Sequence, residues 1–246
     1  MSPPKPWQEI AREAQYYRDS TIAKLEPPLP TLPGDLPLDV SGVPRRYLSE
    51  NEIKLTETAP ETLLAQLANG EITCLAVTKA FLRRAGLAQQ LANCVTELLP
   101  DRAISRAKYA DKYLADHCKP IGPLHGLPIS VKEHIQMDGL GLNLGYVSHY
   151  GETAPEGADA HILQILHDAG AIFYVRTTEP QTIMHLECSS NLYGVTVNPF
   201  NRNLSSGGSS GGEGALIGLR GSCLGIGSDI GGRSSANCSY PDFDVA

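Results

Sequence analysis

The chain has 246 residues, of which 41% are hydrophobic, and a formal net charge of −7 at pH 7, with an isoelectric point near 5.5. This length indicates one large domain or at most two, and the hydrophobic fraction is sufficient for a packed core. The acidic excess is spread along the chain, so electrostatics gives no argument for binding nucleic acid. No stretch approaches the ~20 apolar residues needed to cross a bilayer, and the N-terminus lacks the pattern of a signal peptide. We expect a soluble, cytoplasmic protein without nucleic-acid or membrane partners.

The six cysteines do not follow a metal-binding pattern. No pair has the C-x-x-C spacing, and none has a histidine at zinc-finger spacing. We interpret them as reduced, mostly buried thiols. A secreted disulfide framework is the alternative.

The first 56 residues are expected to form a helix followed by an extended strap. Apolar residues recur at helical spacing over residues 7–25, which predicts an amphipathic helix. The many prolines of residues 26–44 exclude a regular helix and predict an extended segment. Leucines between these prolines are suited to pin the strap to a surface, with a disordered linker as the alternative. We therefore divide the chain into residues 1–56 and a main domain over residues 57–246.

The main domain alternates predicted helices with short apolar strands. Two helices are predicted after residue 57, the first capped by Thr58 or Thr62 and ended by Gly70, the second opened by Thr73. A third covers residues 101–117, and a strand then runs towards residue 132. A fourth helix leads through a glycine into a buried strand over residues 171–175. This alternation predicts an α/β fold with a mixed β-sheet core covered by helices.

Residues 205–235 are unusually rich in glycine and serine. Ser209 and Ser210 lie between two Gly-Gly pairs, and glycine allows a backbone to approach a ligand closely. Residues 212–219 predict a tightly packed helix. A second glycine-rich turn, with accessible backbone amides, is predicted at residues 224–232. Backbone amides in such turns can bind a developing anion, so the two turns predict an oxyanion pocket. A phosphate cradle is excluded, because the Walker pattern is absent and no lysine follows the loop.

Lys132 stands at the end of the predicted apolar strand. A lysine at a desolvated strand end can have a lowered pKa and act as a base. Taken alone, the residues around it favour a surface lysine instead. We interpret other polar residues as structural. His125, His134 and His185 are expected to be packing or surface residues, and Asp229 to hydrogen-bond backbone amides of its loop. Glu213 is expected to interact with the dipole of its helix, and Glu187 and Cys188 to support the wall of the site.

Three segments in register are similar to the amidase signature family, and most of all to its fungal acetamidase-type members. They are "GPLHGLPISVKEHI", "NPFNRNLSSGGSSGGEGALIG" and "GSDIGG". Together with "TTEPQTIMHLECSSNLYGVTVNP" they cover most of the chain from about residue 57 to residue 232.

This resemblance implies a Ser-cisSer-Lys hydrolase that converts a small, acetamide-like carboxamide to a carboxylic acid and ammonia, without metal or cofactor. By position, Lys132 matches the catalytic base and Ser209 the bridging serine, whose preceding peptide is cis in the family. Ile230, Gly231 and Gly232 match the oxyanion loop, and Ile183 falls where the family contacts its substrate. The expected partner is a small-molecule amide, and assembly as a homodimer is left open.

The sequence departs from the family just after that loop. Arg233 stands where the family has its nucleophilic serine, and Ser234 is the neighbouring hydroxyl that would have to replace it. Family members also continue well beyond this point, so the resemblance implies a fold that is incomplete on its C-terminal side. We expect unpaired strand edges at residues 171–175 and 223–230. The alternative to an amidase is therefore an inactive, truncated fragment or pseudoenzyme.

Overall fold

The computed structural model describes residues 5–229, and its core is a mixed sheet of four strands in the order β1-β3-β2-β8. The strands are β1 (Val95–Leu98), β2 (Pro128–Lys132), β3 (Ile172–Thr177) and β8 (Gly225–Ile226). β1 runs antiparallel to β3, whereas β2 is parallel to both β3 and β8. Every residue of β1 and β2 is buried, as expected for strands covered on both faces. The predicted mixed α/β sheet is confirmed.

The expectation of an unpaired strand edge at residues 171–175 is wrong. The segment 171–175 contributes to β3, which lies between β1 and β2 rather than at an edge. Its second neighbour is β1, a short buried run that sequence analysis left unassigned. Within residues 5–229, β8 ends the sheet on the other side.

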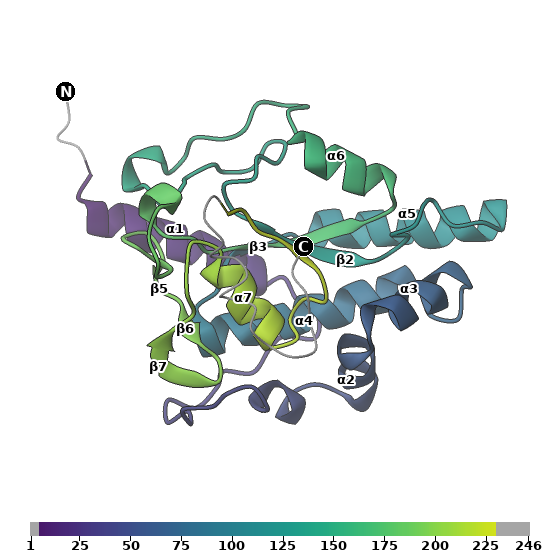
Figure 1. Ribbon diagram of the computed structural model, residues 1–246, viewed down its shortest axis with the longest axis horizontal. Helices are drawn as coiled ribbons and strands as arrows, with labels where there is room; N and C mark the ends of the chain where they lie inside the picture. The colour runs from purple at the N-terminus through teal and green to yellow at the C-terminus, as the bar shows by residue number, and fades with distance from the viewer. Residues whose placement is uncertain (1–4, 230–246) are drawn as a thin grey trace.

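Seven α-helices within the described residues surround this sheet (Figure 1). They are α1 (Trp7–Ile22), α2 (Glu50–Glu57), α3 (Pro60–Ala68), α4 (Cys74–Ala92), α5 (Pro100–His117), α6 (His161–Asp168) and α7 (Gly211–Gly218). Helix α4 is buried along most of its length and contacts α2, α5, α7 and the sheet. It is therefore the central helix of the covering layer.

Of the two predicted helix caps, one is correct and one is wrong. Oγ1 of Thr73 accepts a hydrogen bond from the amide of Ala76 at 3.1 Å and caps α4, as predicted. The predicted cap of α3 is wrong, because this helix begins at Pro60, whose fixed φ suits a first helical position. Thr62 lies inside α3, and the Thr58 hydroxyl instead donates to the carbonyl of Lys54 at 2.6 Å, at the end of α2.

The N-terminal segment packs onto the main domain. Helix α1 contacts β1. The strap that follows contains no regular element before the 3₁₀ helix η1 (Val43–Arg46). Its leucines Leu29, Leu32 and Leu36 pack against the main core, and the amide of Leu32 donates to Oε1 of Gln90 at 3.1 Å. These contacts support the interpretation of a strap pinned by leucines over that of a disordered linker.

Short elements fill the stretch before α7. They comprise the 3₁₀ helices η2 (Val147–His149) and η3 (Gln181–Ile183) and two hairpins, β4 (Ser189–Ser190) with β5 (Gly194–Val195) and β6 (Val197–Asn198) with β7 (Asn201–Ser205). The described cysteines, Cys74, Cys94, Cys118, Cys188 and Cys223, are free thiols. None of the helices within residues 5–229 has the length and apolar character that crossing a bilayer requires.

Candidate active site

The candidate site forms where β2 and β3 end side by side. Lys132 is the last residue of β2 and pairs in register with Thr177, the last residue of β3. The carboxyl ends of parallel strands are a common place for functional side chains. The Lys132 side chain is completely buried, so the interpretation of a surface lysine is wrong.

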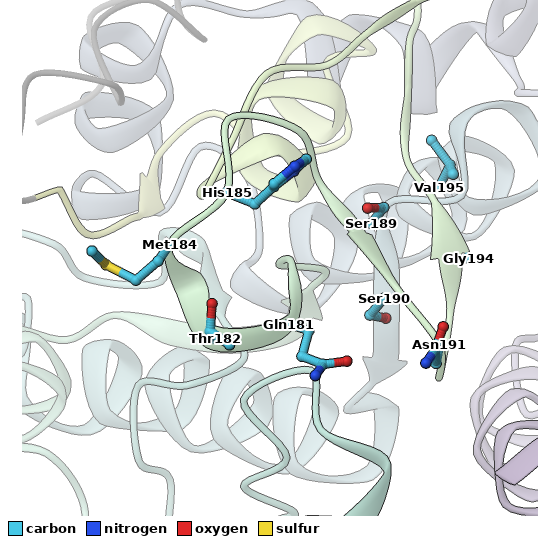
Figure 2. A pocket seen from close by; sticks show the side chains of 9 residues that line it. All are labelled: Gln181, Thr182, Met184, His185, Ser189, Ser190, Asn191, Gly194 and Val195. Carbon is cyan, nitrogen blue, oxygen red and sulfur yellow. The ribbon is translucent and has the colours of Figure 1, made fainter.

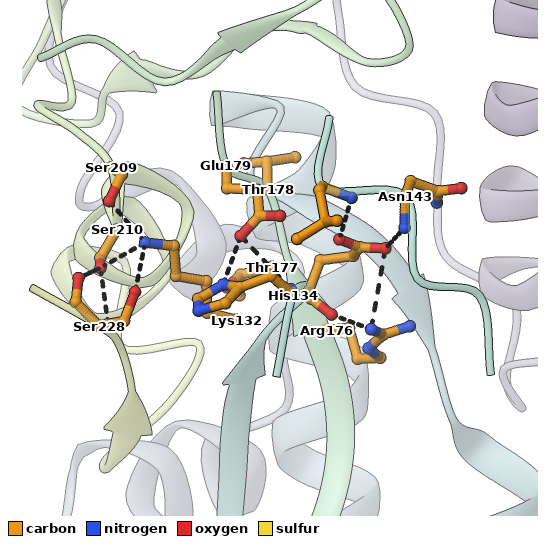
Figure 3. Close-up of polar contacts among 12 residues, drawn as sticks. Lys132, His134, Asn143, Arg176, Thr177, Thr178, Glu179, Ser209, Ser210 and Ser228 are labelled. Atoms are coloured by element: carbon orange, nitrogen blue, oxygen red, sulfur yellow. Dashed lines mark hydrogen bonds and ion pairs between the residues drawn. The ribbon is translucent and has the colours of Figure 1, made fainter. Parts of the chain in front are cut away.

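Three serine hydroxyls surround the Lys132 amine. Nζ lies 2.7 Å from Oγ of Ser209 and 3.1 Å from Oγ of both Ser210 and Ser228 (Figure 3). The peptide bond between Gly208 and Ser209 is cis. The structure therefore brings Lys132 and Ser209 together. Sequence analysis did not select Ser210 or Ser228 as site residues, although each lies in one of the two glycine-rich turns.

Glycines allow the turn that carries Ser209 and Ser210, here called the serine turn, to approach the ends of β2 and β3. A Cβ added at Gly208 would lie 2.6 Å from the carbonyl oxygen of His185. A Cβ at Gly212, in the first turn of α7, would lie 2.5 Å from both the amide nitrogen and the carbonyl oxygen of Thr178. Only a residue without a side chain fits at these contacts, so both glycines help place Ser209 against Lys132.

The environment of Lys132 favours a free amine. Burial lowers its pKa, and nearby acidic side chains, Glu179 first among them, oppose this effect. Its hydrogen-bond partners are neutral hydroxyls. A buried amine with neutral partners can accept a proton from a neighbouring hydroxyl.

Glu213 has contacts beyond the role of helix-dipole partner that the sequence suggested for it. It lies in the first turn of α7, as expected for a dipole partner. Its carboxyl also accepts hydrogen bonds from Ser130 Oγ at 2.5 Å and Thr177 Oγ1 at 2.7 Å. Burial raises its pKa to about 7. Glu213 therefore joins α7 to β2 and β3 directly beneath the serine turn.

A second buried polar cluster lies on the other side of Lys132. The Glu133 carboxyl accepts hydrogen bonds from the amides of Asn143 at 2.6 Å and Leu144 at 3.1 Å. Nη2 of Arg176 lies 3.8 Å from the same carboxyl. Burial raises the pKa of Glu133 to about 7, in spite of the nearby guanidinium.

The histidines are held by hydrogen bonds of different kinds. Nδ1 of His134 lies 2.7 Å from Oε2 of Glu179, a carboxylate contact that sequence analysis missed because the two residues are 45 positions apart. His125 is buried, and its Nδ1 accepts a hydrogen bond from the Ile121 amide at 3.1 Å. Within residues 5–229 no group of three or more metal-ligating side chains gathers.

The other predicted site residues are only partly covered by the structure. Ile183 lies in η3 with a positive φ of 60° and a half-buried side chain. Cys188 is buried and Glu187 is exposed. Asp229 is the last described residue. Five predictions lie outside the described residues: Ile230, Gly231, Gly232, Arg233 and Ser234.

A cavity of about 440 Å³ lies beside the loop that contacts Gly208 (Figure 2). Its lining is mainly polar: Gln181, Thr182, Met184, His185, Ser189, Ser190, Asn191, Gly194 and Val195. Residues of η3 and of the β4–β5 hairpin supply most of this lining.

Comparison with known proteins identifies relatives in fungi. The chain is 44% identical over 231 residues to an acetamidase of Emericella nidulans, covering 93% of this chain and 41% of that protein. It is 47% identical over 198 residues to an acetamidase of Aspergillus oryzae, covering 80% of this chain and 35% of that protein. The chain thus spans less than half the length of these relatives.

Solved structures show the same fold. A fatty acid amide hydrolase matches with a TM-score of 0.83 and 37% identity, over 93% of this chain and 41% of that chain. A peptide amidase from Stenotrophomonas maltophilia matches with a TM-score of 0.68 and 27% identity, over 74% of this chain and 38% of that chain. The amidase family model matches residues 76–234, a range that contains Lys132 and residues 205–234 of the segment rich in glycine and serine. On this combined similarity of sequence and structure, the chain belongs to the amidase family.

Proposed function

We propose that this chain carries the base and the bridging serine of an amidase that converts a small carboxamide to a carboxylic acid and ammonia. The observation that carries the proposal is the 2.7 Å contact between the buried amine of Lys132 and Oγ of Ser209. The names of the fungal relatives support an acetamide-like substrate.

In the proposed mechanism, the neutral amine of Lys132 accepts the proton of Ser209. Ser209 in turn accepts the proton of an attacking hydroxyl, whose oxygen adds to the amide carbonyl. The resulting tetrahedral oxyanion collapses, and the proton returns through Ser209 to the leaving nitrogen, which departs as ammonia. Water then adds to the acyl ester, assisted by the same two residues, and frees the acid. No step requires a metal or cofactor.

The attacking hydroxyl of this mechanism falls beyond residue 229. Arg233 occupies the position at which the family has a serine, and Ser234 follows it. This substitution is the observation that favours the second candidate, a catalytically inactive relative that retains the lysine-serine pair.

The two candidates are separated by measuring ammonia release from acetamide and from an aryl amide. An amidase loses this activity in Lys132→Ala and in Ser209→Ala, whereas the exposed control substitutions Lys119→Ala and Ser148→Ala leave it unchanged. A chain that releases no ammonia, but gains the activity with Arg233→Ser, has lost its nucleophile. Activity that survives Lys132→Ala would contradict the proposed mechanism.

A further inference from the structure

Ser228 reaches the lysine amine from the end of a third strand. β8 is parallel to β2, and Ile226 of β8 pairs in register with Val131 of β2. Because the two strands run in the same direction, Ser228 follows β8 at the edge of the sheet where Lys132 ends β2. Oγ of Ser228 lies 3.1 Å from Nζ of Lys132 (Figure 3). This hydroxyl is therefore in direct hydrogen-bond contact with the proposed base.

The backbone of Ser228 is held by the serine turn. The Ser210 hydroxyl donates a hydrogen bond to the carbonyl oxygen of Ser228 at 3.1 Å and accepts one from its amide at 3.2 Å. These two bonds join the two glycine-rich turns and fix the position of Ser228 beside the amine. Since the proton of Ser210 is engaged with that carbonyl, Ser210 is poorly suited to give a proton to Lys132.

The three hydroxyls around Lys132 match the donors of its charged form. An ammonium group has three N–H donors, and Nζ contacts one oxygen each of Ser209, Ser210 and Ser228. A free amine has two N–H donors and a lone pair, so the lone pair can accept the proton of one of these hydroxyls. Burial lowers the pKa of Lys132 and favours this free form. With Ser210 engaged elsewhere, the proton comes from Ser209 or Ser228.

These two serines differ in exposure. Ser209 is buried, with 6% of its surface exposed, whereas Ser228 is half-buried. An attacking oxygen has to come within about 3–3.5 Å of the substrate carbonyl, so it has to be accessible to a substrate. Ser228 combines this access with a direct contact to the amine.

We propose that Ser228 supplies the attacking oxygen in this chain, and that Lys132 takes its proton directly. The inference rests on the proposed amidase function and changes only the source of the attacking oxygen, which the family has at the position of Arg233.

The proposed step balances without a further reactant. The proton of Ser228 passes to Nζ of Lys132, while Oγ bonds to the amide carbon and the carbonyl electrons move to oxygen. When they return, the carbon–nitrogen bond breaks, and the proton on Lys132 passes through Ser209 to the nitrogen, which leaves as ammonia. Water then gives a proton to Lys132 and adds its oxygen to the acyl carbon. The bond from this carbon to Oγ breaks, the proton returns to Ser228, and the acid is released.

Labelling of the full chain with an alkyl fluorophosphonate locates the attacking oxygen. That oxygen bonds to phosphorus and fluoride leaves, so the chain gains one covalent adduct. Trypsin cleaves after arginine and places the candidate serines in three separate peptides, residues 203–220, 221–233 and 234–246. We expect the adduct in residues 221–233, on Ser228 rather than Ser222 when that peptide is fragmented in the mass spectrometer. An adduct at any other serine overturns the inference.

Substitutions test the same oxygen through its reactivity. Ser228→Ala should lose the label and, where ammonia is released, lower kcat/KM by at least about 10³-fold. Lys132→Met should also lose the label, because the base is removed. The matched control is Ser41→Ala, a half-buried serine of the N-terminal strap, which should label at the rate of the unsubstituted chain. Folded Ser228→Ala that labels at that rate overturns the inference.

The adduct map requires no substitution, so it tests the inference even if Ser228→Ala does not fold. An adduct on Ser228 without ammonia release from acetamide or an aryl amide refutes the proposed function and leaves the inference standing. Ammonia release with the adduct in residues 203–220 or 234–246 leaves the proposed function standing and overturns the inference. A chain that neither labels nor releases ammonia contradicts both.

Discussion

Nη1 of Arg176 on β3 lies 2.9 Å from Oε1 of Glu97 on β1, and both side chains are almost completely buried. The other oxygen of Glu97 accepts a hydrogen bond from Tyr17 of α1 at 2.9 Å. Glu97 thus links the N-terminal helix to the strand that leads into the candidate site.

Removing this carboxylate should destabilise the fold strongly. Glu97→Ala leaves the Arg176 guanidinium buried without its closest anion, and we expect the free energy of unfolding to fall by about 3–5 kcal/mol. Urea denaturation followed by circular dichroism measures the change. Glu156→Ala, at an exposed loop position, should stay within about 0.5 kcal/mol of the unsubstituted chain. Equal stability of the two variants would contradict the importance of this pair.

Replacing Lys132 should separate activity from stability. Lys132→Met abolishes the proposed reaction, yet it removes a buried amine whose desolvation opposes folding, so the variant should be at least as stable as the unsubstituted chain at pH 7. Burial lowers the folded-state pKa of Lys132 below its usual 10.5. Between the lowered pKa of the folded state and 10.5, the unfolded chain binds more protons than the folded chain. The stability of the unsubstituted chain should therefore rise with pH relative to that of the variant. If the difference in unfolding free energy between Lys132→Met and the unsubstituted chain does not narrow towards pH 10.5, this expectation is contradicted.

Glu213 should make stability depend on pH in the opposite direction. Its pKa rises from 4.5 to about 7 on folding, so the folded state binds more protons between these values and stability falls as pH rises through that window. The size of the loss is on the order of 3 kcal/mol. Glu213→Gln keeps a polar group beside Ser130 and Thr177 but cannot ionise, and its stability should be flatter from pH 4.5 to 7. Parallel profiles for the two proteins would show that Glu213 does not titrate there.

The packing of α7 should tolerate no added side chain at Gly212. A methyl group there meets the backbone of Thr178 at 2.5 Å, and we expect Gly212→Ala to lower the free energy of unfolding by about 1–3 kcal/mol or more. At Gly34, an added Cβ meets nothing within 4 Å, so Gly34→Ala is the matched control. Thermal unfolding of the two variants would show the difference, and equal melting temperatures would contradict the observed close approach.

The sequence is sufficient to predict the covering helices other than α2, strands β2 and β3 and the pair Lys132–Ser209. The helices follow from local periodicity, and the pair follows from segments that resemble a known family. The contacts of Glu97 and Glu179 were not predictable, because each depends on which strands are neighbours and in which register. Strand β1 was missed for the same reason, since four buried residues between two helices carry no periodicity of their own.

The hydroxyls that surround the lysine amine lie 77, 78 and 96 positions further along the chain. During synthesis on the ribosome, β2 therefore emerges long before any partner for its terminal ammonium group exists. Until the serine turns arrive, that end of the strand has to stay in contact with water, because a charged amine is unfavourable in an apolar interior. Closure of the site is thus expected among the last events of folding, after the central sheet has begun to assemble.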